Sequence, residues 1–222
     1  MQGNKFKFLK REMAANNKVF KFNNQVYDNI FWSVASGVTV WTFYEVLYFS
    51  AVANELVSTA PFSHYPLEFF AWIICFPLIR GVHFYYIHRL LHYPLLYKHV
   101  HITHHRNVNT GPWSGISMHP IENIIYQSSP LIHFLIPSDP TIFTIHLILV
   151  TLNPAFTHSG FEKIVNKNAK ILDSADFHHQ LHHKYFDCNY GNVDVPLDLW
   201  LGTNHDGTDD CMKRLRERKR KK

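Results

Sequence analysis

Two long apolar stretches stand in the first half of the chain. Residues 30–57 contain only two acids, Glu45 and Glu55, and are long enough to cross a hydrocarbon core of about 30 Å. Residues 67–86 form a second candidate span, in which Pro77 favours a kink or an early end of the helix. The pattern therefore predicts membrane-spanning helices.

Two shorter apolar blocks follow, at residues 121–136 and 142–156, and Pro137 and Pro140 between them suit a tight helical hairpin. Neither block reaches the roughly 20 residues of a spanning helix, so a re-entrant or interfacial position stays open for both. From residue 162 onward the chain is polar, and we expect this part in the cytosol. The predicted fold class is all-α, a helical integral membrane domain with a cytosolic helical cap.

The two ends of the chain are marked by their basic charge. Of the 222 residues only 18% are charged, yet the formal net charge is +5, because lysine and arginine crowd both ends. Beside apolar spans, basic blocks are typical of cytoplasmic ends that face anionic lipid, and we expect no nucleic acid partner. We divide the chain into a cytosolic basic N-terminal segment (1–29), a membrane and catalytic domain (30–205) and a basic C-terminal tail (206–222).

The three cysteines form no Cys-x-x-Cys pair, which disfavours both a disulfide framework and a thiolate zinc site. The 17 histidines are the more informative residues, since eight of them fall into one H-x-x-x-H and two H-x-x-H-H motifs. Residues spaced by three and four lie on one face of a helix. The eight are His88, His92, His101, His104, His105, His179, His182 and His183.

Eight neutral nitrogen donors are too many for one ion, so the count predicts two metals. Histidines packed this densely would repel one another on protonation unless a metal held them neutral. Isolated histidines are more often surface residues or satisfied core residues. We interpret the following ones in that way: His64, His83, His99, His133, His146 and His205.

Iron is the favoured metal on chemical grounds. The clusters contain neither thiolates nor paired carboxylates, which disfavours iron–sulfur and carboxylate-bridged sites. The ligands stand beside membrane spans, where substrates carry inert C–H bonds, and redox-inert zinc cannot oxidise these with O₂. We expect two Fe ions with O₂ as co-substrate, and zinc as a possible substitute in purified protein.

With these motifs in place, residues 67–203 resemble the fatty acid hydroxylase and sterol desaturase superfamily. The run IHRLLHYPLLYKHVHITHH is similar to the first two histidine boxes of that family. HPIE is similar to its His-Pro element, HSGFE to its penultimate histidine region, and HHQLHHKYFDCNYG with PLDLWLGT to its last box. The ending most resembles the sterol C5-desaturase branch, while HSGF is also similar to the C4-methylsterol oxidases.

The resemblance implies that the eight clustered histidines bind metal and adds His158 as a ninth ligand. His119 either completes a ligand set, supports one from outside or starts a helix before Pro120. Some family members have a further histidine four residues before the one at 158, where this chain has Pro154. One metal is therefore a ligand short, and Asn153, His119 or water are the candidates to fill the place.

The aspartates near the last motif have two open interpretations. Asp173, Asp176 and Asp187 either orient ring nitrogens from outside the centre or are solvated loop carboxylates.

The predicted function is an O₂-dependent oxidation, hydroxylation or desaturation, of a lipid such as a sterol or a fatty acyl chain. The sequence has no flavin or nicotinamide fingerprint, so electrons must come from a partner such as cytochrome b5 or a ferredoxin. The catalytic site should face the cytoplasm, at the endoplasmic reticulum of a eukaryote or the inner membrane of a bacterium.

Two other classes of function remain open. A membrane zinc hydrolase would use a glutamate base such as Glu122 or Glu162, although the chain has no H-E-x-x-H motif and such an enzyme leaves most histidines unexplained. A histidine-rich metal-buffering protein would place its histidines in disordered tracts or along spans.

Overall fold

The computed structural model describes residues 13–161, 163–166, 169–173 and 175–220. Glu162 lies outside this part of the chain, and so do six residues of the basic ends, namely Lys5, Lys7, Lys10, Arg11, Lys221 and Lys222. The side chain of Asp173 is not among those described.

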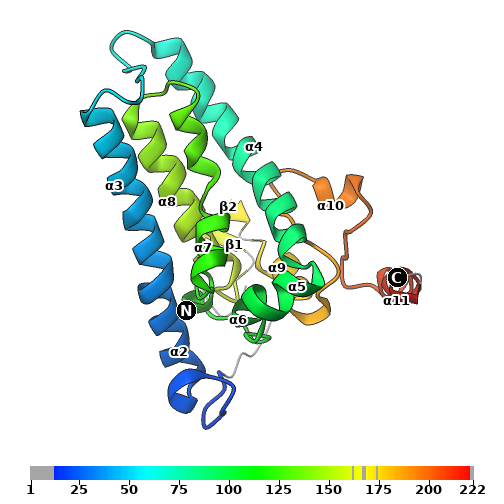
Figure 1. Ribbon diagram of the computed structural model, residues 1–222. Coiled ribbons are helices and arrows are strands. Elements are labelled where there is room, and N and C mark those ends of the chain that lie inside the picture. The colour runs from blue at the N-terminus through cyan, green and yellow to red at the C-terminus, as the bar shows by residue number, and fades with distance from the viewer. Residues whose placement is uncertain (1–12, 162, 167–168, 174, 221–222) are drawn as a thin grey trace.

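Three helices are long and apolar enough to cross a membrane, and they lie side by side (Figure 1). The first is continuous from α2 (Gln25–Trp32) through the π-helical η2 (Ser33–Val38) into α3 (Thr39–Ala53). The other two are α4 (Pro66–Leu91) and α8 (Pro140–Thr157). The chain is thus an integral membrane protein, as predicted.

The first span begins earlier than the apolar pattern indicates. The side chain of Asn24 accepts hydrogen bonds from the backbone N–H groups of Val26 and Tyr27, which satisfies two donors that a helix start leaves free. The cap places the helix start at Gln25, five residues ahead of position 30.

The helix α4 runs without a break past Pro77, so the expectation of an early end is wrong. A proline removes one backbone hydrogen bond, but in a long apolar helix the remaining bonds within the segment are kept, because no water is there to replace them. The unbroken helix brings its last turn, with His88, and its C-terminal cap residue, His92, to the end of the bundle.

The third apolar block does not form one helix but two short ones, α7 (Pro120–Tyr126) and the 3₁₀ helix η5 (Ser129–Phe134). The fourth block extends beyond its predicted limits into α8, where the Asp139 side chain accepts a hydrogen bond from the Thr141 N–H and caps the helix start. Of these two shorter blocks, only the fourth one in the chain forms a candidate span.

Aromatic stacking and one close backbone approach hold the bundle together. The rings of Tyr48 and Phe143 stack at a centroid distance of 3.8 Å between α3 and α8. Gly115 lies so close to α8 that a Cβ atom there would stand 2.7 Å from the carbonyl carbon of Pro154. That contact fixes the loop before α7 against the end of α8.

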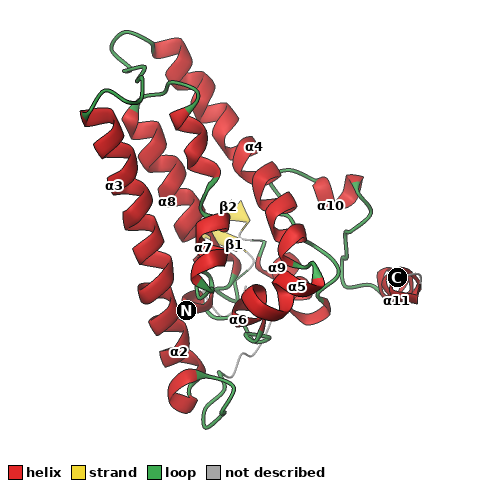
Figure 2. Ribbon diagram, in the orientation of Figure 1, coloured by secondary structure: helices red, strands yellow, loops and turns green. Residues whose placement is uncertain are grey.

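Short elements gather at one end of the long helices (Figure 1) and, apart from one two-stranded antiparallel hairpin, they are helical (Figure 2). The all-α prediction is confirmed with this addition. Besides α7 and η5, the short elements in chain order are η1 (Lys21–Asn23), α5 (Pro94–Leu96), η3 (Tyr97–His101), α6 (Ile102–His105), η4 (Pro112–Ser114), β1 (Lys163–Asn166), β2 (Ala169–Asp173), α9 (Asp176–Tyr185), α10 (Leu197–Trp200) and α11 (Asp209–Arg220).

Charged contacts fasten this end of the molecule. Arg106, directly after α6, forms an ion pair with Asp28 of α2, whose side chain is fully buried. In the basic tail, Arg218 of α11 donates to the backbone carbonyls of Gly202 and Asp187. The described part of the tail is thus a helix packed on the protein.

Candidate metal centre

Nine of the ten predicted metal-binding histidines come together in two groups, in each of which the potential ligand atoms all lie within 4.8 Å of one another. The five-histidine group contains His88, His92, His101, His105 and His182. The four-histidine group contains His104, His158, His179 and His183. The prediction of a histidine-rich centre for two metals is confirmed at the level of these clusters.

Each H-x-x-H-H motif serves both groups. In residues 101–105 the first and last histidines join the five-histidine group, while His104 joins the other. In residues 179–183 the assignment is reversed, and His182 is the one that joins the five-histidine group. Side chains four apart project one turn apart from the same face, whereas the side chain three apart is rotated away from them. The two motifs therefore face each other across the centre in a complementary way.

Helix ends carry the remaining members. His88 and His92 stand in the last turn and at the C-terminal cap of α4, and His158 is the C-terminal cap residue of α8. The Nδ1 atom of His158 lies 2.6 Å from the hydroxyl oxygen of Ser114, in the segment that the Gly115 contact presses against α8. The packing of the long helices thus sets the position of three candidate ligands.

Backbone carbonyls orient two rings of the five-histidine group from outside. Nδ1 of His182 lies 2.6 Å from the carbonyl oxygen of Cys188, and Nδ1 of His88 lies 2.7 Å from that of Tyr190. A carbonyl only accepts, so Nδ1 donates in both rings, and a neutral ring then has its lone pair on Nε2. The loop after α9 therefore turns these two Nε2 lone pairs toward the centre.

The inner nitrogens lie at distances that suit a shared ion. Nε2 of His182 lies 2.9 Å from Nε2 of His105 and 3.1 Å from that of His92, which in turn lies 3.2 Å from Nε2 of His101. Two nitrogens bound at right angles, about 2.1 Å from one ion, are about 3 Å apart. Neutral rings can share protons at these distances, and a cation between the nitrogens can take the place of those protons when each ring turns a lone pair inward, so the residues fit a bound metal.

The electrostatics of the site keep its rings uncharged. Burial lowers the pKa of His104 to about 3. Burial, together with the neighbouring histidines, also lowers the pKa of His105 and His183 well below the usual range. Neutral imidazole is the form that binds a metal, so no proton has to leave these rings at neutral pH.

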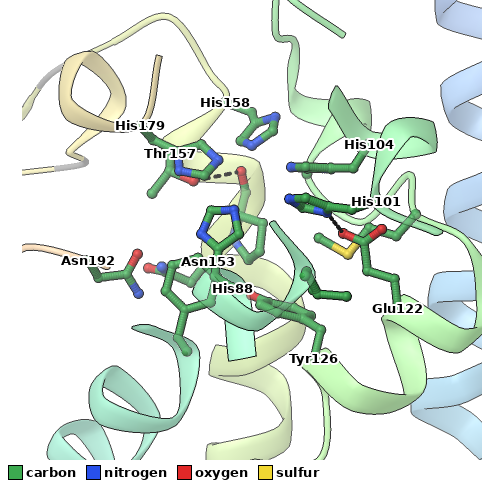
Figure 3. A pocket seen from close by; sticks show the side chains of 15 residues that line it. His88, His101, His104, Glu122, Tyr126, Asn153, Thr157, His158, His179 and Asn192 are labelled. Carbon is green, nitrogen blue, oxygen red and sulfur yellow. Dashed lines mark hydrogen bonds and ion pairs between the residues drawn. The ribbon is translucent and has the colours of Figure 1, made fainter. Parts of the chain in front are cut away.

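The two groups adjoin each other and border a common cavity. The rings of His105 and His183, one from each group, stack at a centroid distance of 4.6 Å. Rings of both groups line the cavity, and Figure 3 shows His101 and His104 facing His158 across it. Its remaining lining includes apolar side chains of α4, the loop before α7 and α7, namely Phe84, Leu91, Met118 and Tyr126, and the polar Asn153, Thr157 and Asn192.

His92 differs from the other eight because it is half-buried, whereas they are buried. It lies at an open groove on the outer side of α4, which Tyr86, Arg89 and Tyr190 also line. The centre is thus bordered by an inner cavity and by an outer groove, which touch different histidines.

His119 lies in neither group. It is the N-terminal cap residue of α7, where its Nδ1 accepts a hydrogen bond from the backbone N–H of Ile121 at 3.2 Å. Asp187 pairs with Lys219 of α11 at 3.3 Å. Asp176 is fully buried at the start of α9. The six isolated histidines also lie outside both groups.

Sequence reasoning missed the outer partners of the rings. Glu122, which we had weighed only as a hydrolytic base, lies 2.6 Å from Nδ1 of His101. A glutamate three residues after the histidine of a His-Pro pair is an available signal. Backbone carbonyls such as those of Cys188 and Tyr190 are common to every residue type and leave no mark in the sequence.

Comparisons with known proteins agree with this geometry. The chain is 31% identical over 133 residues to a Delta(7)-sterol 5(6)-desaturase (ERG3B) of Gibberella zeae, covering 59% of this chain and 41% of that protein. It is 28% identical over 135 residues to a Delta(7)-sterol-C5(6)-desaturase of Nicotiana tabacum, covering 59% and 48%. It is 34% identical over 146 residues to the fatty acid hydroxylase domain-containing protein 2 of Macaca fascicularis, covering 62% and 41%.

The chain spans less than half the length of these three relatives. No solved structure matches it significantly. The model of the fatty acid hydroxylase family matches residues 72–203, which include all nine grouped histidines. On this match, which extends over more than half of its residues, the chain belongs to the fatty acid hydroxylase family.

Proposed function

We propose that the protein is a non-haem di-iron membrane oxidoreductase that uses O₂ to hydroxylate or desaturate a lipid. One observation carries the proposal: two adjoining groups of histidines, all but His92 buried, border a partly apolar cavity at the end of three candidate membrane-spanning helices. The grouped histidines His88, His92, His101, His105 and His182, and His104, His158, His179 and His183, are the proposed ligands.

The chemistry of the ligands supports iron. Imidazole binds iron as readily as zinc. Two iron ions, when bound, would supply the activation of O₂ that removal of hydrogen from an inert C–H bond requires, which zinc cannot supply. The four-histidine group offers fewer ligands than its neighbour, and the Asn153 side chain lines the cavity beside it. An incompletely filled set of ligands is typical of a catalytic site.

The cavity walls support a lipid substrate. Phe84, Leu91 and Met118 place apolar surface beside the histidines, which disfavours water at the reacting position and suits contact with an alkyl group. The Delta(7)-sterol desaturases among the relatives favour a sterol, while the family description also allows a fatty acyl chain.

Electrons would come from a separate donor such as cytochrome b5 or a ferredoxin. The groove at His92 supports this arrangement, because it reaches a candidate ligand from outside without passing through the cavity. We place the centre on the cytoplasmic side, since the basic tail beside it matches the charge distribution of cytoplasmic segments.

Metal analysis and product analysis test the proposal together. Protein purified without oxygen from iron-supplemented cells should contain two iron ions per chain. Lipids from cells that express it should contain an O₂-dependent product. The variants His104→Ala and His182→Ala, one from each group, should abolish this product, since catalytic groups that act as a unit fail together.

The matched control is His99→Ala, which removes an exposed histidine from the same segment as His101 and should leave metal and product unchanged. One metal per chain, absence of iron, or retained product in His104→Ala would contradict the proposal. His119→Ala has its own outcome: retention of both metals assigns His119 to the cap of α7, and loss of one makes it a ligand.

A further inference from the structure

Glu122 is a buried acid at the metal centre, and its side chain does not make the hydrogen bond that its place in the helix would favour. It is the third residue of α7, where a glutamate commonly turns back to bond the backbone N–H of the cap residue. Here the side chain is only 1% exposed and instead puts Oε1 at 2.6 Å from Nδ1 of His101. Its other oxygen, Oε2, has no hydrogen-bond partner among the described residues.

Three other rings have a neutral group beside their Nδ1 atom. His88 and His182 donate to backbone carbonyls, and His158 lies against the hydroxyl of Ser114. Neither histidine group includes a carboxylate, so divalent ions bound there keep their charge inside a buried site. An uncompensated buried charge is costly, and a carboxylate beside a ligand ring offsets part of it. Glu122 therefore provides a negative charge that the partners at the Nδ1 atoms of His88, His182 and His158 lack.

We propose that Glu122 is a positioning residue of the five-histidine group. Its carboxylate accepts the Nδ1–H of His101, turns Nε2 of that ring toward the ion, and supplies negative charge to it. The inference rests on the proposed metal centre. Outer partners of this kind commonly change metal affinity by roughly 10–100-fold when they are removed.

Two substitutions separate the hydrogen bond from the charge. Glu122→Gln keeps an acceptor oxygen of similar reach but loses the charge, while Glu122→Ala loses both. The control Glu68→Gln makes the same chemical change at an exposed position in the first turn of α4. Each protein is purified in detergent with iron bound and dialysed against a series of chelator concentrations.

We expect Glu122→Ala to lose iron at a chelator concentration roughly 10–100-fold lower than the wild type, with Glu122→Gln in between. Glu68→Gln should match the wild type. A positioning role lowers the melting temperature chiefly of the iron-loaded protein, whereas a merely structural role lowers that of the iron-free protein equally. Iron retention by Glu122→Gln equal to that of the wild type, or an equal loss of melting temperature with and without iron, would overturn the proposal.

The iron measurements need no lipid oxidation, so they stand apart from the proposed function. If Glu122→Ala does not fold, Glu122→Gln still decides the matter, because it preserves the shape of the side chain. If the wild type binds two iron ions but forms no product, the proposed function fails and the role of Glu122 is still measured.

Discussion

Two sets of histidines in the protein interior differ in the partners of their ring nitrogens. At the metal centre the Nε2 atoms converge, and His182 lies 2.9 Å from His105. Between η5 and α8 a second pair, His133 and His146, lies with Nε2 of one ring 3.1 Å from Nδ1 of the other. There each remaining nitrogen has a serine hydroxyl within 3.0 Å, from Ser138 and Ser129.

The difference shows what separates a metal site from a satisfied core. In the second pair a chain of donors and acceptors runs from serine to serine, so neutral rings need nothing further. At the centre, the Nδ1 atoms of His105 and His183 have no hydrogen-bond partner among the described residues, and the inner nitrogens converge on one another instead of on serine hydroxyls. Only the pair His133 and His146 has all of its ring nitrogens hydrogen-bonded without an ion.

Of the changes that test this difference, metal removal should lower the stability of the protein most. A ligand that binds only the folded state stabilises it by about 4 kcal/mol when its free concentration is about a thousand times Kd. For a chain of this size that corresponds to a fall in melting temperature of roughly 8–16 °C per ion. We expect a fall of this order when chelator strips the purified protein, measured by thermal unfolding in detergent.

Reloading the ion should restore the melting temperature, which distinguishes metal loss from damage by the chelator. The variant His183→Ala, already lacking one ligand, should lose less on chelation than the wild type. If protein shown to be metal-free kept its melting temperature, the centre would need an ion no more than His133 and His146 do.

Ser114→Ala should have a smaller effect. It removes the hydroxyl that holds Nδ1 of His158 at 2.6 Å, and we expect metal affinity to fall by about tenfold, at the lower end for outer partners. Chelator titration measures it. Ser159→Ala is the control, because that hydroxyl bonds the backbone carbonyl of Phe156 instead. Equal affinity in both variants would show that His158 needs no outer partner.

The sequence predicted the spans and the centre to different depths. The apolar pattern located two spans and left the third, α8, open, because its block looked too short to cross a membrane. The start of the first span at Gln25 depends on the Asn24 cap, and the continuity of α4 past Pro77 depends on surroundings without water. The block at 121–136 was uninformative, because a buried short helix and a spanning helix have the same composition.

Motif spacing identified the grouped histidines because i, i+3 and i+4 positions share a helix face. It could not show that His104 and His182 join opposite groups, since that depends on how α6 and α9 face each other. His133 and His146 were rightly set apart as singletons, but their pairing comes from tertiary packing of η5 on α8. The spacing of histidines therefore predicts which of them are candidate metal ligands, whereas tertiary packing decides which group or partner each one joins.

The smallest predicted effect belongs to the second pair. His133→Leu leaves Nδ1 of His146 and the hydroxyl of Ser138 without their partner, and we expect a loss of about 1 kcal/mol in unfolding free energy. Iron content and product should stay as in the wild type. The double variant His133→Leu/His146→Leu should lose less than the sum of the two single ones, because removing both partners leaves fewer unsatisfied groups. If His133→Leu instead releases iron, the pair is coupled to the centre, and complete hydrogen bonding would not be what distinguishes the two sets.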